Sequence, residues 1–513
     1  MSQPELAAPL GAPRLAPRAS KADFHLLPAL EKNPRAVRFA LSRAGKATLV
    51  AGFAAMAWLV HKPAAVAGVA LVVFFPARRR FMIALASLAM VLVTSRLDEL
   101  LQALAKQEAL PRLAHHFAFK PAVLLLSLGL VIGFVQLVKT RLSALQRWSV
   151  ATLVTLNAGL LGLVALLPLQ GAWRALAWAV VAGAGGYLWY AAYSLGDRGD
   201  RRGRTLLKDA SAWRPFWGGT AVPFPKPGRS LEELEVRTPE EAAVWQLKAL
   251  KLVTWALMLA VLRTALVLLA TGGPSYPSGW LPDTVLAMAP SASFAGMSLQ
   301  VPSLQDALAL SLAGTPHSAA VNWASLALHL GVDLLDISIL GHVVVAGARM
   351  AGFKALRNTH RPLESRSIAD FWNRYYFYFK ELLLDFFFFP AYMRWFKKHP
   401  RLRLFFATFA AAGLGNFLYH WLADPAGMVS FGFWGSLLAR ETYALYVVLL
   451  VLGIGLSQMV KPRSATRPSY MARVATTSGV LLFYGLLQIP NVAPMGSSVG
   501  DCFRFLLCLC PQL

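Results

Sequence analysis

The sequence predicts an all-α membrane protein that crosses the bilayer about ten or eleven times. Of the 513 residues, 57% are apolar and only 15% are charged, well below the roughly 25% that is typical of soluble domains. Residues 121–138 and 150–167 contain no ionisable side chain. A helix of a soluble protein normally keeps one polar face, so stretches of this kind predict membrane spans.

Basic residues separate the apolar stretches. The formal net charge is +25, and many of the lysines and arginines fall in short clusters at residues 78–80, 139–147, 197–204 and 461–467. This is the positive-inside pattern, which predicts a cytoplasmic amino terminus, with every cluster on the cytoplasmic side of the membrane. No nucleic-acid partner is expected, because no basic face carries a fold that could enter a groove.

The alternation of apolar and polar stretches divides the chain into five parts. We expect a basic, mobile cytoplasmic arm (1–45), a transmembrane bundle (46–195), a cytoplasmic connection (196–248), a second membrane-embedded region (249–490) and a carboxyl-terminal tail (491–513). No internal repeat is visible, which argues against transporter folds built from repeated halves. Residues 95–120 alternate leucines with charges at helical spacing, which predicts an amphipathic helix along the interface.

The predicted spans follow the apolar runs of the sequence. They are residues 46–60, 63–77, 81–95, 121–138, 150–167, 172–195, 249–270, 322–350, 402–422, 434–460 and 474–489, with 46–60 and 63–77 forming a tight pair. Residues 371–390 form an aromatic segment with embedded charges.

The three cysteines, Cys502, Cys508 and Cys510, lie close together near the carboxyl terminus. They are too few for a structural zinc site, and we expect ordinary thiols in an amphipathic tail. A disulfide or a lipid attachment is the alternative.

Ionisable residues inside predicted spans are costly and indicate function. His420 ends the span at 402–422; an imidazole there acts either as a base near neutral pH or as a structural group bonded across helices. Arg263 stands alone in its apolar span, and we interpret it as a paired packing charge.

A second group of ionisable residues lies on the predicted span 322–350. Asp333 and Asp336 are three residues apart, with His329 and His342 on either side. Three interpretations compete: a proton relay, a hydrogen-bonded packing network and a metal site. The His–Asp spacing permits a metal, but further ligands do not follow nearby, so we expect no metal and favour the packing network.

Residues 358–392 combine charged, amide and aromatic side chains. Ser367 is placed to cap a helix whose first turn carries Asp370, where the helix dipole favours an acid. Lys380, Glu381 and Asp385 interrupt a run of Phe, Tyr and Leu. A helix of this kind cannot face lipid all round, so it lines protein or a water-filled passage.

Residues from Asp336 to His420 carry an ordered set of motifs. Asp336 with Ser338 comes first, followed by Ala348, Arg349, Gly352 and Phe353, then Asn358, Arg361 and Pro362, then Ser367, Ile368, Asp370, Phe371, Trp372 and Arg374, then Asp385 and Pro390, and finally His420 near the end of an apolar helix. In this order and spacing the chain resembles the membrane-bound O-acyltransferase family, in particular its alginate- and teichoic-acid-modifying branch.

The resemblance implies a fold of transmembrane helices around a central tunnel. It implies a thioester co-substrate, acyl-CoA or an acyl carrier, that enters from the cytoplasm, with no tightly bound cofactor. His420 would deprotonate a hydroxyl of a glycan, lipid or metabolite acceptor, which then attacks the thioester carbonyl. Membrane lipids and an accessory protein are the further expected partners.

The chain departs from the family pattern at three positions. Tyr376 stands where the family has His or Asn, His342 replaces an Asp and Asn373 replaces an Arg. Tyr376 can donate a hydrogen bond to the thioester carbonyl, and Asn373, nearly one helical turn before it, is a candidate polar partner. The residues expected to bind substrate or to support the site are Asp336, Asn358, Arg361, Asp370, Trp372, Arg374 and Asp385.

Two alternatives to an enzyme stay open at the level of sequence. Tyr376 at a signature position favours a non-catalytic protein on the same scaffold, such as a lipid or glycan conduit or a subunit of a complex. A proton-coupled transporter using Asp333, Asp336 and His342 is the second alternative.

Overall fold

The computed structural model describes residues 27–59, 64–92, 97–109, 112–197, 199, 213, 215–218, 222–224, 226–273, 276, 299–459 and 469–510. Within these ranges all regular structure is helical, apart from one isolated bridge between Glu235 and Phe353. Most of the predicted arm (residues 1–26), the basic cluster at 461–467 and most of the cluster at 197–204 lie outside the described residues.

Seven of the described helical segments are long and apolar enough to cross a membrane, and α10 (Gly171–Gly185) with α11 (Leu188–Gly196), which meet at a bend of 45°, would make an eighth. The seven are α7 (Phe119–Thr140), α9 (Ser149–Leu166), α14 (Pro239–Thr271), α16 (Ala319–Met350), the combined segment Pro400–Leu422, α24 (Glu441–Met459) and α25 (Tyr470–Val492). The all-α, multi-pass class predicted from composition is confirmed.

Three amino-terminal helices occupy segments that were also predicted to span. They are α2 (Arg43–Leu59), α3 (Ala64–Phe74) and α4 (Arg79–Leu92), and their described parts of 17, 11 and 14 residues are shorter than the seven long segments.

The helix α1 (Pro34–Leu41) precedes them, inside the segment predicted as a mobile arm. Asn33 caps it by accepting a hydrogen bond from the Arg35 amide, and Pro34 takes its first position, where a missing N–H costs nothing. The helix packs against α14, so part of the expected arm belongs to the folded body.

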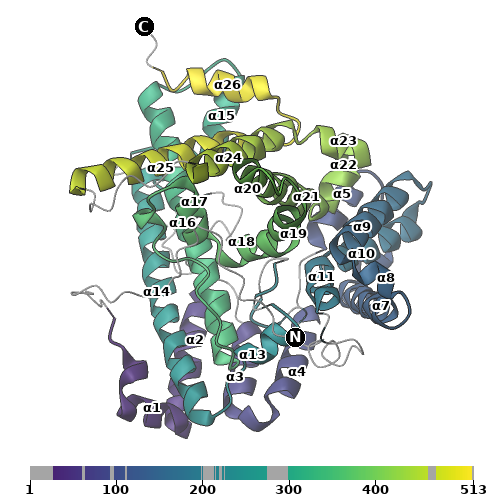
Figure 1. Cartoon of the computed structure of the whole chain (residues 1–513), viewed down its shortest axis with the longest axis vertical. Coiled ribbons are helices and arrows are strands. Elements are labelled where there is room, and N and C mark those ends of the chain that lie inside the picture. Colours follow the sequence, from purple (N-terminus) through teal and green to yellow (C-terminus); the bar gives the residue numbers. More distant parts are fainter. Residues whose placement is uncertain are drawn as a thin grey trace.

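The helix α16 lies inside the protein, with α14 alongside it (Figure 1). In its most apolar stretch 78% of the residues are buried, against 28% for α9. The difference follows from composition, because α16 carries Asp333 and Asp336 whereas α9 has no charged side chain. Charges in a membrane-embedded helix are stable only where protein or water faces them, and α9 is free to face lipid.

The two ends of the long axis are built from different parts of the chain (Figure 1). At one end lie α1 to α4 and α13 (Arg229–Leu234); at the other lie α15 (Leu304–Leu312) and α26 (Val499–Leu507). A reciprocal capping box between Ser498 and Asp501 starts α26. The Trp323 indole then donates to the Leu509 carbonyl at 2.9 Å, which fastens the carboxyl-terminal segment to α16. Cys502 is buried, Cys510 is exposed, and all three cysteines are free thiols.

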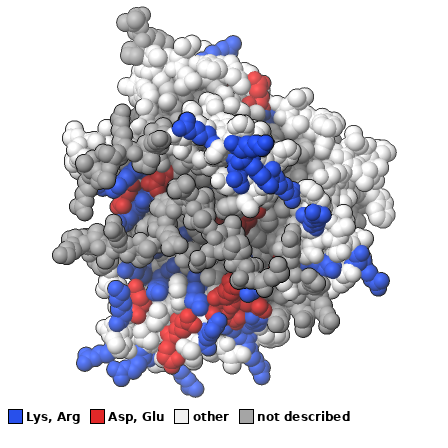
Figure 2. All heavy atoms as spheres, viewed as in Figure 1, with Lys and Arg blue, Asp and Glu red and all other residues white. Residues whose placement is uncertain are grey.

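Charged side chains of both signs gather at the lower end of the face drawn in Figure 2, the end that holds α1, α4 and α13 in Figure 1. Glu235 accepts from Arg79 and Arg80, and Lys354 pairs with Glu241 at 3.2 Å. Burial raises the pKa of Glu235, but the two arginines outweigh it and hold that pKa below its ordinary value. These pairs tie α4 to the residue that follows α13, and the segment after α16 to the start of α14.

Short helices follow the connection after α16. They are α17 (Ile368–Tyr375), α18 (Phe377–Leu383) and α19 (Phe389–Arg394), and the long segment Pro400–Leu422 after them consists of α20 (Pro400–Thr408) and α21 (Asn416–Leu422). The π-helical turn η6 (Leu384–Phe388) joins α18 to α19 and the turn η7 (Phe409–Gly415) joins α20 to α21, and the two turns pack against each other. Such turns often occur at functional sites.

The remaining short elements are η1 (Leu30–Lys32), η2 (Pro76–Arg78), α5 (Asp98–Ala105), α6 (Arg112–His115), α8 (Ser143–Gln146), η5 (Pro362–Glu364), α22 (Pro425–Phe431) and α23 (Phe433–Leu438). The amphipathic segment predicted within residues 95–120 contains α5. Its apolar residues Leu100, Leu101 and Leu104 are buried, and α5 packs against α22. This apolar face therefore meets protein rather than the lipid interface.

Candidate active-site cavity

A cavity of about 500 Å³ lies among α16, α17, α18, α21, α24 and α25 and contains His420, Tyr376 and Trp372 of the predicted site. The described residues that line it are Gln305, His329, Leu330, Val332, Asp333, Phe371, Trp372, Tyr375, Tyr376, Phe379, Asn416, Tyr419, His420, Tyr443, Tyr446, Tyr484, Leu487, Gln488, Asn491 and Val492. We call it the central cavity.

His420 is held among aromatic rings at the end of α21. Its ring centroid lies 5.9 Å from that of Phe379, 5.1 Å from that of Tyr419 and 5.2 Å from that of Tyr443. None of the described residues forms a hydrogen bond with the imidazole, and the side chain is partly exposed where it lines the cavity. Its ring nitrogens are therefore open to a molecule in the cavity.

Tyr376 reaches the same cavity because the chain breaks between two helices at this residue. It adopts φ −138° and ψ 82°, which ends α17 at Tyr375 and starts α18 at Phe377. Asn358 supports the break: its backbone carbonyl accepts from the Phe377 amide at 2.9 Å and its side-chain oxygen from the Tyr378 amide at 3.3 Å. These are amides that the first turn of a helix leaves without a partner. Asn358 is thus a positioning residue for Tyr376.

The prediction that Asn373 lies beside Tyr376 on one helical face is wrong. The helix α17 ends before Tyr376, so the expected one-turn spacing does not apply. Asn373 is exposed and is not among the described residues that line the central cavity.

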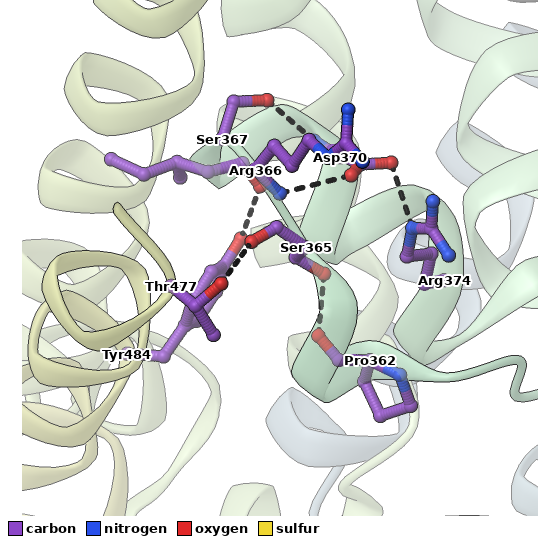
Figure 3. Close-up of polar contacts among 9 residues, drawn as sticks. Pro362, Ser365, Arg366, Ser367, Asp370, Arg374, Thr477 and Tyr484 are labelled. Atoms are coloured by element: carbon purple, nitrogen blue, oxygen red, sulfur yellow. Dashed lines mark hydrogen bonds and ion pairs between the residues drawn. The ribbon is translucent and has the colours of Figure 1, made fainter. Parts of the chain in front are cut away.

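Asp370 and Arg374 secure the start of α17 (Figure 3). The Ser367 hydroxyl accepts from the Asp370 amide at 3.0 Å, which confirms the predicted cap. The Asp370 carboxylate accepts from the Arg366 amide at 3.0 Å and pairs with Arg374 at 2.9 Å. Neither charged side chain is among the described residues that line the central cavity.

The same turn is fastened to α25. The Tyr484 hydroxyl donates to the Ile368 carbonyl at 3.0 Å and the Thr477 hydroxyl to the Ser365 carbonyl at 3.1 Å (Figure 3). The Tyr484 ring also lies against Phe371, with 3.9 Å between centroids. Since Phe371 and Tyr484 both line the central cavity, these contacts fix its wall.

Arg361 stands outside the cavity, in the connection between α16 and α17. It has a left-handed backbone, with φ 50°, and its exposed side chain pairs with Glu364 at 3.4 Å. The neighbouring His360 amide donates to the Arg374 carbonyl at 2.8 Å. Burial, followed by the charges of Arg357, Arg361 and Arg374, lowers the pKa of His360, which favours its neutral form at pH 7.

Asp336 forms an ion pair with Arg263 between α16 and α14. The Arg263 Nε lies 2.8 Å from the Asp336 carboxylate, and both side chains are fully buried. The Arg263 Nη2 donates to the other Asp336 carboxylate oxygen at 3.4 Å and to the Tyr276 carbonyl at 3.3 Å. The interpretation of Arg263 as a paired packing charge is confirmed, and Asp336 holds two helices together rather than lining the cavity.

Asp333, one turn earlier on α16, does line the central cavity. Its carboxylate accepts a hydrogen bond from the Tyr375 hydroxyl at 2.6 Å. His342 Nδ1 contacts the Ser338 carbonyl at 2.5 Å within α16, and His329 Nδ1 lies 3.5 Å from the Tyr276 hydroxyl. The polar residues of α16 therefore serve separate contacts.

Several cavity residues could not be identified from motifs. Tyr443 donates to the Asn416 side chain at 3.2 Å, and Asn491 donates to Gln488 at 2.9 Å. The signal available in the sequence was the spacing of Tyr443 and Tyr446, three apart in an otherwise apolar helix. That spacing puts them on one face.

Asp385 lies at a second cavity, of about 890 Å³, bordered by α9, α11, α13 and η6. It pairs with Lys226 at 2.5 Å and accepts from the Tyr193 hydroxyl at 3.1 Å. Arg147, Arg229 and Arg394 also line this space, as do Asp197 and Glu233, and Arg229 pairs with Glu233 at 3.2 Å. Because cations outnumber carboxylates among these residues, we call it the basic cavity.

Aromatic rings stand between the two cavities. Trp189 stacks on Phe386, which lines the basic cavity, with centroids 6.0 Å apart. On its other side Trp189 stacks on Tyr419, which lines the central cavity, at 5.8 Å. Tyr419 in turn contacts Phe379 at 4.7 Å. The partition also includes the helix α21, because Leu418 lines the basic cavity and Tyr419 and His420 line the central cavity.

No protein-family model matches this sequence, and the search of curated proteins found no match.

Proposed function

We propose that the protein is a membrane-bound O-acyltransferase of the bacterial inner membrane. The observation that carries the proposal is that His420, in α21, and Tyr376, at the break between α17 and α18, both line the central cavity. An imidazole with open ring nitrogens and a phenol are a base and a hydrogen-bond donor, the two groups that acyl transfer to a hydroxyl requires.

The reaction can be written with each atom accounted for. His420 takes the proton of the acceptor hydroxyl as its oxygen attacks the thioester carbonyl. The Tyr376 hydroxyl donates to the carbonyl oxygen as negative charge develops there. The new C–O bond forms, the C–S bond breaks, and the thiolate recovers a proton from the imidazolium. The aromatic wall around His420 limits competing hydrolysis by excluding water.

We assign the donor to the basic cavity and the acceptor to the central cavity. Thioester carriers such as acyl-CoA are anionic. The cations that line the basic cavity (Arg147, Lys226, Arg229 and Arg394) outnumber its carboxylates (Asp197, Glu233 and Asp385) by one, and this excess of positive charge favours such a ligand. Arg147 belongs to a cluster expected on the cytoplasmic side. The acyl chain would pass the partition at Trp189 and Tyr419 to meet the acceptor at His420, within the tunnel expected for this fold.

The test compares lipids and surface glycans, by mass spectrometry, from cells with wild-type protein, without it, and with His420→Ala. We expect an acylated product that disappears in the last two, because loss of a general base costs about 10²- to 10⁴-fold in rate. His399→Ala, which changes an exposed histidine at the start of α20, is the matched control and should retain the product. Undiminished product with properly inserted His420→Ala would refute the assignment and leave a non-catalytic scaffold.

A further inference from the structure

The central cavity has an unusual balance of charge for a space that would hold an alcohol. Among the described residues that line it, Asp333 is the one carboxylate, and none is lysine or arginine. The two histidines, His329 and His420, are the remaining ionisable groups apart from tyrosines. An electronegative interior of this kind attracts a cation and disfavours an anion.

Aromatic rings surround the carboxylate. Tyr375 donates to it at 2.6 Å, and Tyr446 lies within electrostatic reach of it. The rings continue from Tyr375 to Trp372 at 6.4 Å and to Phe371 at 5.3 Å between centroids, all of them lining the cavity. The faces of such rings attract ammonium groups, whereas small inorganic cations prefer shells of oxygen ligands.

Asp333 lines the central cavity, whereas its neighbour Asp336 on the same helix does not. Asp333 and Asp336 are separated by one turn of α16, yet Asp336 is fully buried against Arg263 while Asp333 is partly exposed. Asp336 therefore has the packing role, through its ion pair with Arg263. Asp333 is the member of the pair whose charge a ligand can meet.

We propose that the central cavity recognises a reactant through an organic ammonium group, primary or quaternary, placed between Asp333 and the aromatic wall. The proposal rests on the proposed function in taking the ligand to be a reactant. The ammonium group is carried by the hydroxyl acceptor or by the acyl chain of the donor, and both sources present the same chemistry to Asp333.

The first experiment measures binding to the purified full-length protein with choline and its neutral isostere 3,3-dimethylbutan-1-ol, by isothermal titration calorimetry at constant ionic strength. We expect choline to bind about tenfold more tightly, the effect of an ion pair and ring contacts of about 1.4 kcal/mol. Asp333→Asn should remove this preference, and Asp333→Glu should keep part of it. Equal binding of the two probes to wild type, or an undiminished preference in Asp333→Asn, overturns the proposal.

Controls separate folding from recognition. Glu364→Gln removes an exposed carboxylate outside the cavity and should leave the preference unchanged. Tyr446→Leu removes a ring but no charge and should reduce the preference by about threefold to tenfold, which tests the aromatic wall if Asp333→Asn does not fold. A Tyr446→Leu protein with the full preference contradicts the aromatic part of the proposal.

Two further arms identify the source and keep this proposal separate from that of catalysis. Transfer assays compare choline as acceptor with acetyl-CoA as donor, and ethanol as acceptor with glycyl-CoA as donor. If Asp333→Asn slows only the first pairing, the acceptor supplies the ammonium group that Asp333 binds. If it slows only the second, the acyl chain of the donor supplies it. His420→Ala should abolish transfer and retain the choline preference. A wild-type protein that prefers choline but transfers nothing refutes the enzyme and leaves the cation site, whereas transfer without charge preference refutes the site alone.

Discussion

At the scale of single residues, the ion pair between Asp336 and Arg263 fastens α16 to α14 inside the membrane-embedded body. Both side chains have no exposed surface, and their closest atoms are 2.8 Å apart. Removing two charges from water is costly, so such a pair is stable only while both partners are present. Asp336, which a motif alone would assign to the active site, therefore acts first on stability.

We expect Arg263→Met to destabilise the protein by about 3 to 5 kcal/mol, because it leaves a buried carboxylate without its cation. The double variant Arg263→Met/Asp336→Leu should recover most of the loss, since neither charge is then buried alone. Thermal unfolding in detergent measures both. A double variant that is no more stable than the single one contradicts the explanation.

Tyr376 permits a second test at this scale. We expect Tyr376→Phe to lower kcat about 10²- to 10³-fold, because the carbonyl oxygen loses a donor in the transition state, with little change in thermal stability. Tyr392→Phe, near the surface in α19, is the control for loss of a phenol. Full activity in Tyr376→Phe would remove this tyrosine from the reaction.

At the scale of elements, the π-helical turns η6 and η7 shape the region around His420. Gly415 ends η7, and a Cβ added there would lie 2.7 Å from the Phe387 ring in η6. The absence of a side chain thus permits the two turns to approach each other. Since α21 continues directly from η7, the direction in which His420 points depends on this contact.

We expect Gly415→Ala to destabilise the protein by about 1 to 3 kcal/mol, as overpacking does, and to reduce activity through His420. Adding Phe387→Leu should restore part of both. Gly159→Ala, in α9 with no atom near the added methyl group, should be neutral or stabilising by about 0.5 to 1 kcal/mol. Equal behaviour of the two alanine variants in thermal unfolding and transfer would contradict a role for close packing.

Some of these elements could be predicted from the sequence, and others could not. Apolar length predicts α7, α9 and α14, and local capping chemistry predicts the Ser367 cap, because each depends on neighbouring residues in the chain. The break at Tyr376 depends on Asn358, which is distant in sequence and contacts the start of α18. Helical spacing alone therefore misplaced Asn373.

Contacts between residues distant in sequence are the second reason why the structure differs from the predictions. Asp333 and Asp336 look equivalent in sequence, but Tyr375 and Arg263 give them different roles. The π-helical turns were not predicted either, because the insertion of one residue leaves no distinct hydropathy signal. His420, Tyr376 and Trp372 of the predicted site line one cavity. Asp370 and Arg374 pair with each other, whereas Asp336, Arg361 and Asp385 pair with residues outside the motif.

At the scale of the whole molecule, the chain places α1 and α26 at opposite ends of its long axis (Figure 1). The basic clusters predict that the amino-terminal end is cytoplasmic. The acceptor would then approach the central cavity from the side of Gln305 and Asn491, and the donor would enter the basic cavity from the other.

Labelling with a membrane-impermeant maleimide tests this orientation in spheroplasts. We expect Cys510, kept as the single cysteine, to react in intact spheroplasts, because it is exposed and follows α26, at the end that the basic clusters predict to be external. A single cysteine at Arg38, in α1, should react only after lysis. The reverse pattern would invert the topology and exchange the sides assigned to donor and acceptor.

The proposed reaction depends on His420 activating a hydroxyl for attack on a thioester. Thiol release from an acyl-CoA by the purified protein in the presence of an acceptor tests this step, followed at saturating donor for wild type, His420→Ala and His399→Ala. We expect wild type and His399→Ala to release thiol together with acylated product, and His420→Ala to be slower by about 10²- to 10⁴-fold with its stability intact. A His420→Ala protein that releases thiol and forms product at the wild-type rate would exclude His420 as the base.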